Sequence, residues 1–233
     1  MVLLFAIVYL GGSPVIGAIS AGEEVKIIQD MGLGALSFLG VIVAILVGTT
    51  LVYQEVEKRT LYTILSKPVH RYQFILGKFL GLCLVLTVIT FFMSLIFFGF
   101  LWYQKIPIHL GHFQAILLQL FALFLLTAIA TFFSSITTPI LTAFFTISFY
   151  IAGTTIYSVV MKNRLRHLSE TWIPLYKALN AVIPNFYFFN MNVRAAHGMS
   201  MPWTEFGFSL LYGSLYIIIL IIFSILLFDR RDF

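Results

Sequence analysis

The sequence predicts an all-α integral membrane protein with six transmembrane helices. Of its 233 residues, 61% are hydrophobic and only 10% are charged, and the mean hydropathy is +1.02. The charged residues are grouped, which leaves long runs without any Asp, Glu, Lys or Arg. A helix needs about 20 apolar residues to cross a bilayer, and each of these runs reaches that length. The composition therefore excludes a soluble globular domain.

The charge-free runs define the expected spans. The first run starts at the first residue with no basic segment ahead of it, so it does not resemble a cleavable secretory signal. The run 106–161 is too long for one span, and SSITTP at 134–139 provides a turn because Pro139 suits the first turn of a helix. We expect spans at about 1–21, 31–53, 76–103, 113–133, 139–161 and 206–228.

Residues 173–189 form a seventh apolar segment that is too short and too interrupted to cross. Pro174, Lys177 and Pro184 break it. Irregular backbone at membrane depth must be covered by protein, because unpaired polar groups are costly in lipid. We therefore expect a re-entrant or interfacial helical segment before the last span.

Residues 54–78 form a charged island between two apolar runs. Glu55 and Arg59 are spaced to pair on one helix, and Pro68 would end that helix. One interpretation is an amphipathic helix lying on anionic headgroups. Because such a surface would repel Glu55 and Glu57, contact with a partner in water fits better. The charged members are Glu55, Glu57, Lys58, Arg59, Lys67, Arg71 and Lys78.

The number of basic residues on each side does not decide which side of the membrane is cytoplasmic. Six spans place seven Lys and Arg residues on each side of the membrane. The island holds five of them within residues 58–78, close to two spans. This density favours the island side as cytoplasmic.

The island also carries a resemblance to a known family. Residues 55–71 (EVEKRTLYTILSKPVHR) and 76–81 (LGKFLG) resemble the type-2 ABC transporter permeases, and most closely the subgroup of the nitrous-oxide-reductase maturation permease. Residues 184–186 (PNF) resemble that family's stretch before the last span, and 228–233 (FDRRDF) resemble its short basic tail. The resemblance covers nearly the whole chain and supports a cytoplasmic island.

The resemblance implies that residues 55–67 are a cytoplasmic coupling helix that docks into a separate ATP-binding cassette subunit. It also implies a second permease chain, identical or paralogous, and a place in the cytoplasmic (inner) membrane of a prokaryote, where export is the expected direction. The ATPase-binding residues carried over are Glu55, Glu57, Lys58, Arg59, Thr60, Leu61, Thr63, Ser66, Lys67, Pro68 and Arg71.

The sequence supports transport that is driven by a separate subunit. It contains no Gly-x-x-x-x-Gly-Lys-Ser/Thr phosphate loop, and the cores of the predicted spans contain no carboxylate, Lys, Arg or His. Ion-coupled transporters place ionisable groups there. We expect no cofactor and no catalysis in this chain, and membrane lipids rather than nucleic acid around it, because the net charge of +5 is typical of juxtamembrane residues.

Family members usually begin with a cytoplasmic amphipathic connector helix ahead of the first span, and residues 1–22 do not resemble such a helix. A shortened start and a divergent member are both compatible with this.

Two other functions remain open: a scaffold that anchors a partner without transport, and a membrane-embedded transferase. The transferase is disfavoured because neither Glu23-Glu24 nor Glu55 with Glu57 has a supporting His. A metal site at His109 and His112 lacks further ligands nearby.

Overall fold

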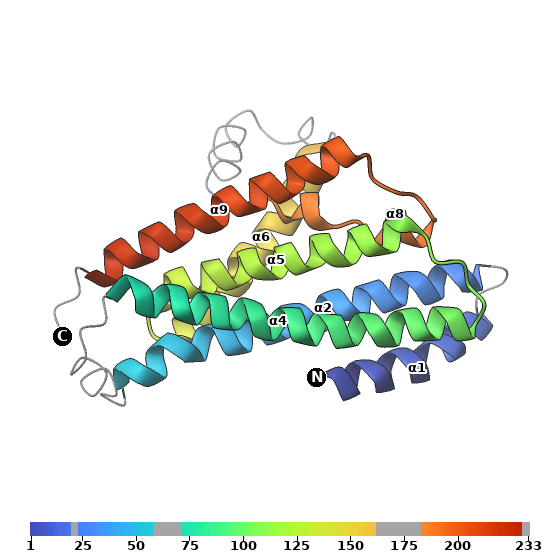
Figure 1. Cartoon of the computed structure of the whole chain (residues 1–233), viewed down its shortest axis with the longest axis horizontal. Coiled ribbons are helices and arrows are strands. Elements are labelled where there is room, and N and C mark those ends of the chain that lie inside the picture. Colours follow the sequence, from blue (N-terminus) through green and yellow to red (C-terminus); the bar gives the residue numbers. More distant parts are fainter. Residues whose placement is uncertain (20–22, 58–70, 162–182, 230–233) are drawn as a thin grey trace.

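The computed structural model of the chain is a bundle of long helices (Figure 1). It describes residues 1–19, 23–57, 71–161 and 183–229. Within these ranges the regular elements are helices, with no strand. They are α1 (Val2–Ile19), α2 (Glu24–Glu57), α4 (Arg71–Tyr103), α5 (Leu110–Ser134), α6 (Pro139–Met161), the 3-10 turn η3 (Phe186–Phe189), α8 (Asn192–Ala196) and α9 (Trp203–Asp229).

Four helices of the described part are long and apolar enough to cross a membrane. The qualifying stretches are Glu24–Thr49 in α2, Tyr72–Tyr103 in α4, Leu110–Ser134 in α5 and Trp203–Leu227 in α9. The apolar stretches Val2–Gly12 of α1 and Pro139–Thr155 of α6 are shorter. The structure therefore supports an all-α membrane protein with four candidate spans, and crossings by α1 and α6 stay predictions.

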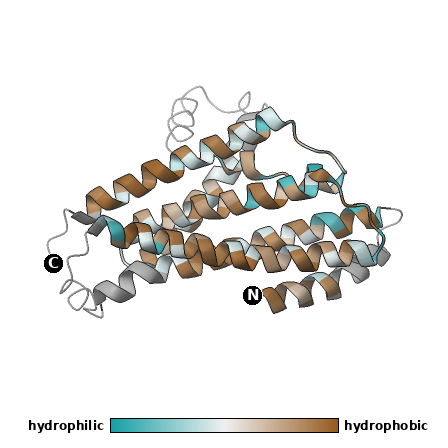
Figure 2. Ribbon diagram, viewed as in Figure 1, coloured by the Kyte–Doolittle hydropathy of each residue, from teal (hydrophilic) through white to brown (hydrophobic). Residues whose placement is uncertain are grey.

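Two helices continue beyond the ranges predicted from hydropathy. α2 was expected over 31–53 and α4 over 76–103, and both extend into charged residues. Charge limits how much of a helix can lie in lipid, but it does not end the backbone hydrogen bonding. Hydropathy colouring shows the result as long brown helices with teal mainly near their ends (Figure 2).

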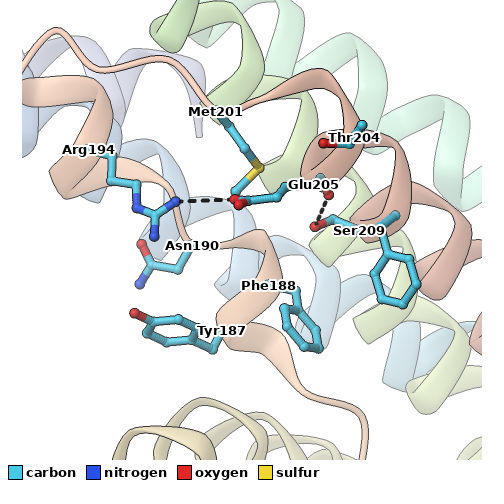
Figure 3. A pocket seen from close by; sticks show the side chains of 9 residues that line it. Tyr187, Phe188, Asn190, Arg194, Met201, Thr204, Glu205 and Ser209 are labelled. Carbon is cyan, nitrogen blue, oxygen red and sulfur yellow. Dashed lines mark hydrogen bonds and ion pairs between the residues drawn. The ribbon is translucent and has the colours of Figure 1, made fainter. Parts of the chain in front are cut away.

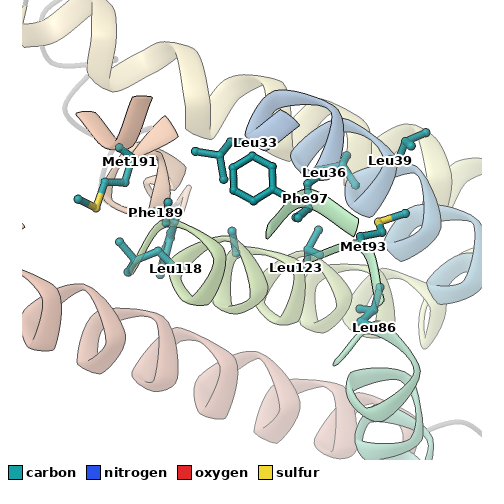
Figure 4. Close-up of a cluster of buried hydrophobic side chains, with 14 of the residues drawn as sticks. Leu33, Leu36, Leu39, Leu86, Met93, Phe97, Leu118, Leu123, Phe189 and Met191 are labelled. Atoms are coloured by element: carbon teal, nitrogen blue, oxygen red, sulfur yellow. The ribbon is translucent and has the colours of Figure 1, made fainter. Parts of the chain in front are cut away.

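α5 lies at the centre of the bundle. It packs against α2, α4, α6 and α9, and 61% of its span is buried, compared with 17% of the span in α9. Its side chains Leu118 and Leu123 join Leu33 and Leu36 of α2 and Phe97 of α4 in one buried apolar cluster (Figure 4). Of the four candidate spans, α9 therefore leaves the most surface for lipid or another chain.

The turn between α5 and α6 falls where the sequence predicts it. α5 ends at Ser134 and α6 begins at Pro139. The hydroxyls of Ser135 and Thr137 donate to the carbonyl oxygens of Phe132 (2.7 Å) and Phe133 (2.9 Å). Backbone N–H groups of Ser135 and Thr137 also donate to these two oxygens, so each hydroxyl adds a second bond to a carbonyl at the end of α5.

Most polar residues within the helices bond to their own backbone. Thr87 donates to the carbonyl of Cys83, Thr127 to that of Leu123 and Thr131 to that of Thr127, each four residues earlier. A hydroxyl placed in this way needs no partner from another helix. These threonines therefore need no polar partner across the bundle.

Candidate functional site

The predicted ATPase-binding segment lies only partly within the described structure. α2 continues through Glu55 to Glu57, and α4 begins at Arg71, so two helix ends at the same end of the bundle flank residues 58–70 (Figure 1). Glu55 and Glu57 thus belong to the last turn of α2. The other carried-over residues lie outside the described residues: Lys58, Arg59, Thr60, Leu61, Thr63, Ser66, Lys67 and Pro68.

A cap segment, residues 183–202, lies at the opposite end of the bundle. The sequence predicts a re-entrant or interfacial helical segment over 173–189, of which 173–182 lie outside the described residues. In the rest, residues 183–185 are not helical and η3 is one 3-10 turn. The side chains of Phe186, Phe189 and Ala195 are buried in the cap segment, which packs against α2, α5 and α6.

Glycines allow the backbone of the cap segment to approach two helices. A Cβ added to Gly153 of α6 would lie 2.4 Å from the carbonyl oxygen of Pro184. A Cβ added to Gly111 of α5 would lie 2.5 Å from that of Met199. Real Cβ atoms essentially never come so close to another heavy atom. The two glycines therefore set how closely the cap segment sits on the bundle.

Side-chain hydrogen bonds hold the cap segment at two further points. The amide of Gln114 donates to the carbonyl of Met201 (3.0 Å) and accepts from its N–H (2.9 Å). The N–H of Asn185 donates to the hydroxyl of Tyr212 on α9 (2.9 Å). Gln114 is 3% exposed, so its two bonds are shielded from water. A buried donor or acceptor that loses its partner is costly.

We expect Gln114→Met to weaken the attachment of the cap segment. Methionine keeps the approximate shape of glutamine but leaves both polar groups of Met201 without this partner, at a cost of about 2 kcal/mol. Thermal unfolding of the purified protein should show the loss. The matched control is Gln104→Met at an exposed position after α4. Equal stability of the two variants would contradict a role for the Gln114–Met201 bonds in holding the cap segment.

The pair His109 and His112 shapes the start of α5. The N–H of His109 donates to Nδ1 of His112 (3.1 Å), and the fully buried ring of His112 lies against Phe97. At a span end both histidines would be expected at the interface, but His112 is a core residue. No group of three or more potential metal ligands occurs among the described residues.

The buried glutamines of α5 are not among the residues predicted from the sequence. Besides Gln114, Gln119 of α5 is buried, and its Oε1 accepts a hydrogen bond from the hydroxyl of Ser37 on α2 (2.7 Å). The available signal was an amide within a long run free of charge, where a polar group needs a partner. An amide in such a run is expected to form a hydrogen bond, but the sequence does not say with which residue.

The cap segment and α9 enclose a cavity of about 480 Å³, here named the α8–α9 cavity (Figure 3). Arg194 of α8 and Glu205 of the first turn of α9 form an ion pair there, with Nη1 and Oε2 3.7 Å apart. Asn190, Thr204 and Phe208 also contribute to the wall. The cavity thus places one positive and one negative group together near the end of a candidate span.

A second cavity, of about 400 Å³, lies between the start of α2 and α8. Lys26 donates a hydrogen bond to Glu23 (3.0 Å). This bond and the charge of Lys26 hold the pKa of Glu23 below its usual value. Both side chains are exposed to solvent, so the pair contributes little to stability.

The comparison with protein families decides the class of the molecule. The profile of the ABC-2 family transporter proteins matches residues 2–233. The chain belongs to the ABC-2 transporter family. A comparison with curated proteins finds no match. ABC-2 permeases are membrane subunits that generally work with an ATP-binding cassette subunit, and the four apolar helices agree with this class. The match is to the family as a whole, so the nitrous-oxide-reductase maturation subgroup stays a prediction.

Proposed function

We propose that this chain is the permease subunit of an ATP-driven exporter in the cytoplasmic membrane of a prokaryote. Two such chains, or one with a paralogue, each dock a separate cytoplasmic ATPase through residues 55–71. Closure of the ATPase dimer on ATP pushes on the two docked segments and moves the helix bundles between conformations. The observation that carries the proposal is the ABC-2 family match over residues 2–233, which includes the charged island.

The buried interior supports an energy source outside the chain. Within residues 1–12, 23–49, 72–155 and 183–227, the buried polar side chains are Ser, Thr, Asn, Gln and His, and none is Asp, Glu, Lys or Arg. Coupling to an ion or proton gradient generally relies on acidic or basic groups within the membrane. Driving transport by hydrolysis on a partner subunit requires no such group in the permease.

The double variant Glu55→Ala with Arg59→Ala tests the docking. Exposed charge contacts contribute about 0.5–1 kcal/mol each, so the affinity for the ATPase should fall roughly tenfold while the chain still inserts in the membrane. The measurements are co-purification of the ATPase and ATP-dependent transport in vesicles.

The matched control is Glu23→Ala with Lys26→Ala, which removes an exposed pair at the opposite end of the bundle. The control should bind and transport normally. If the Glu55 and Arg59 variant also does so, docking through residues 55–71 is wrong. If the ATPase binds but vesicles show no transport of any candidate substrate, the chain is a scaffold.

A further inference from the structure

The ion pair in the α8–α9 cavity is loose and accessible. Its shortest contact, 3.7 Å between Arg194 and Glu205, is longer than the 2.7–2.9 Å of a charge-assisted hydrogen bond. The side chains are 53% and 59% exposed. A surface pair of this kind contributes little stability, so a ligand can separate its two groups at small cost. A ligand that carries both charges would satisfy both.

The cavity lies beside the start of the candidate span in α9, where lipid headgroups are expected. Trp203, at the start of α9, is 66% exposed, as is typical of aromatic residues at a membrane interface. Phe208 lines the cavity and is itself 63% exposed. Leu211 and Leu215 follow it at helical spacing and are also more than half exposed. An apolar stripe therefore runs from the cavity along α9 towards the membrane centre.

These observations identify one occupant. We propose that the α8–α9 cavity binds the headgroup of phosphatidylethanolamine from the leaflet at this end of the bundle. The lipid phosphate pairs with the guanidinium of Arg194, and its primary ammonium donates to the carboxylate of Glu205. The acyl chains lie along the stripe that begins at Phe208. The proposal does not depend on the ATPase contact or on the direction of transport.

The same chemistry predicts which lipids bind less well. The quaternary ammonium of phosphatidylcholine has no N–H, so it cannot donate a hydrogen bond to Glu205. Phosphatidylglycerol lacks the cation, so its glycerol hydroxyls can donate to Glu205 but cannot neutralise its charge. A hydrogen bond to a charged group contributes enough to change an affinity about tenfold. The affinity of the cavity for phosphatidylethanolamine should therefore be about tenfold higher than its affinity for phosphatidylcholine.

The test is native mass spectrometry of the full chain, purified in its assembly and given equal amounts of the three phospholipids. We expect wild type to retain phosphatidylethanolamine about tenfold over phosphatidylcholine. Glu205→Gln should abolish this preference, and Arg194→Gln should lower retention of all three lipids. The matched controls Glu23→Gln and Lys26→Gln, which remove charges at the same end of the bundle but outside the cavity, should behave as wild type.

Several results would overturn the proposal. One is equal retention of ethanolamine and choline lipid by wild type, and another is an unchanged preference in Glu205→Gln. If soluble glycerophosphoethanolamine competes as strongly as the whole lipid, the site binds a free zwitterion and the stripe plays no part. If cysteines at Leu211 and Leu215 cross-link two copies completely while lipid is absent, a second chain covers this face. Should Arg194→Gln fail to fold, Arg194→Lys and Glu205→Gln carry the test.

Discussion

Replacing Gly153 with valine is expected to destabilise the protein by about 3 kcal/mol and to loosen the cap segment from α6. An added Cβ would lie 2.4 Å from the carbonyl oxygen of Pro184 and 2.7 Å from the ring of Phe186. The ring can move, but the oxygen belongs to the backbone. Either α6 or the start of the cap segment must therefore shift. Denaturation of the purified protein measures the cost, and hydrogen exchange over residues 184–189 measures the loosening.

Gly99→Val in α4 is the matched control for this variant. Gly99 is also within a long helix, but an added Cβ would meet nothing within 4 Å. Because valine is a slightly better helix former than glycine, the control should lie within about 1 kcal/mol of wild type. If Gly153→Val unfolds like the control and leaves residues 184–189 as protected as before, the close contact with Pro184 does not hold the cap segment.

The helices were predictable because hydropathy and proline act locally. The break at Pro139 needed only the length of the run 106–161 and the residues within it. The backbone bonds of Thr87 and Thr127 were predictable for the same reason, because the partner lies four residues earlier on the same helix. The helix ends of α2 and α4 were placed less well, because a helix can continue into charged residues outside lipid.

The sequence predicts an irregular segment at 173–189, which overlaps the cap segment only at 183–189, and it does not predict how that segment is attached. Gln114 bonds to Met201 across 87 positions of the chain, and Gly111 and Gly153 look like ordinary helix glycines until their neighbours are known. Such pairings depend on the tertiary arrangement, which no local pattern encodes. The ATPase-binding residues stay predictions for another reason, since most of them lie outside the described residues.

Gly111→Val tests the other end of the cap segment and is expected to cost about as much as Gly153→Val, roughly 3 kcal/mol. An added Cβ would lie 2.5 Å from the carbonyl oxygen of Met199 and 3.6 Å from the Cα of Ala195. The oxygen of Met199 is a backbone atom, so α5 and the segment that follows α8 must separate. Hydrogen exchange should rise over residues 195–201 and stay low over 184–189, which is the reverse of the pattern for Gly153→Val.

Gly207→Val is the control for Gly111→Val, because Gly207 lies near the start of α9 and its added Cβ would meet nothing within 4 Å. The two attachments are formed by different helices and different parts of the cap segment. If they act independently, the losses in stability of Gly111→Val and Gly153→Val should add to within about 0.5 kcal/mol in the double variant. A double variant no less stable than either single variant would show that the first substitution already frees the whole cap segment, which would then be one cooperative unit.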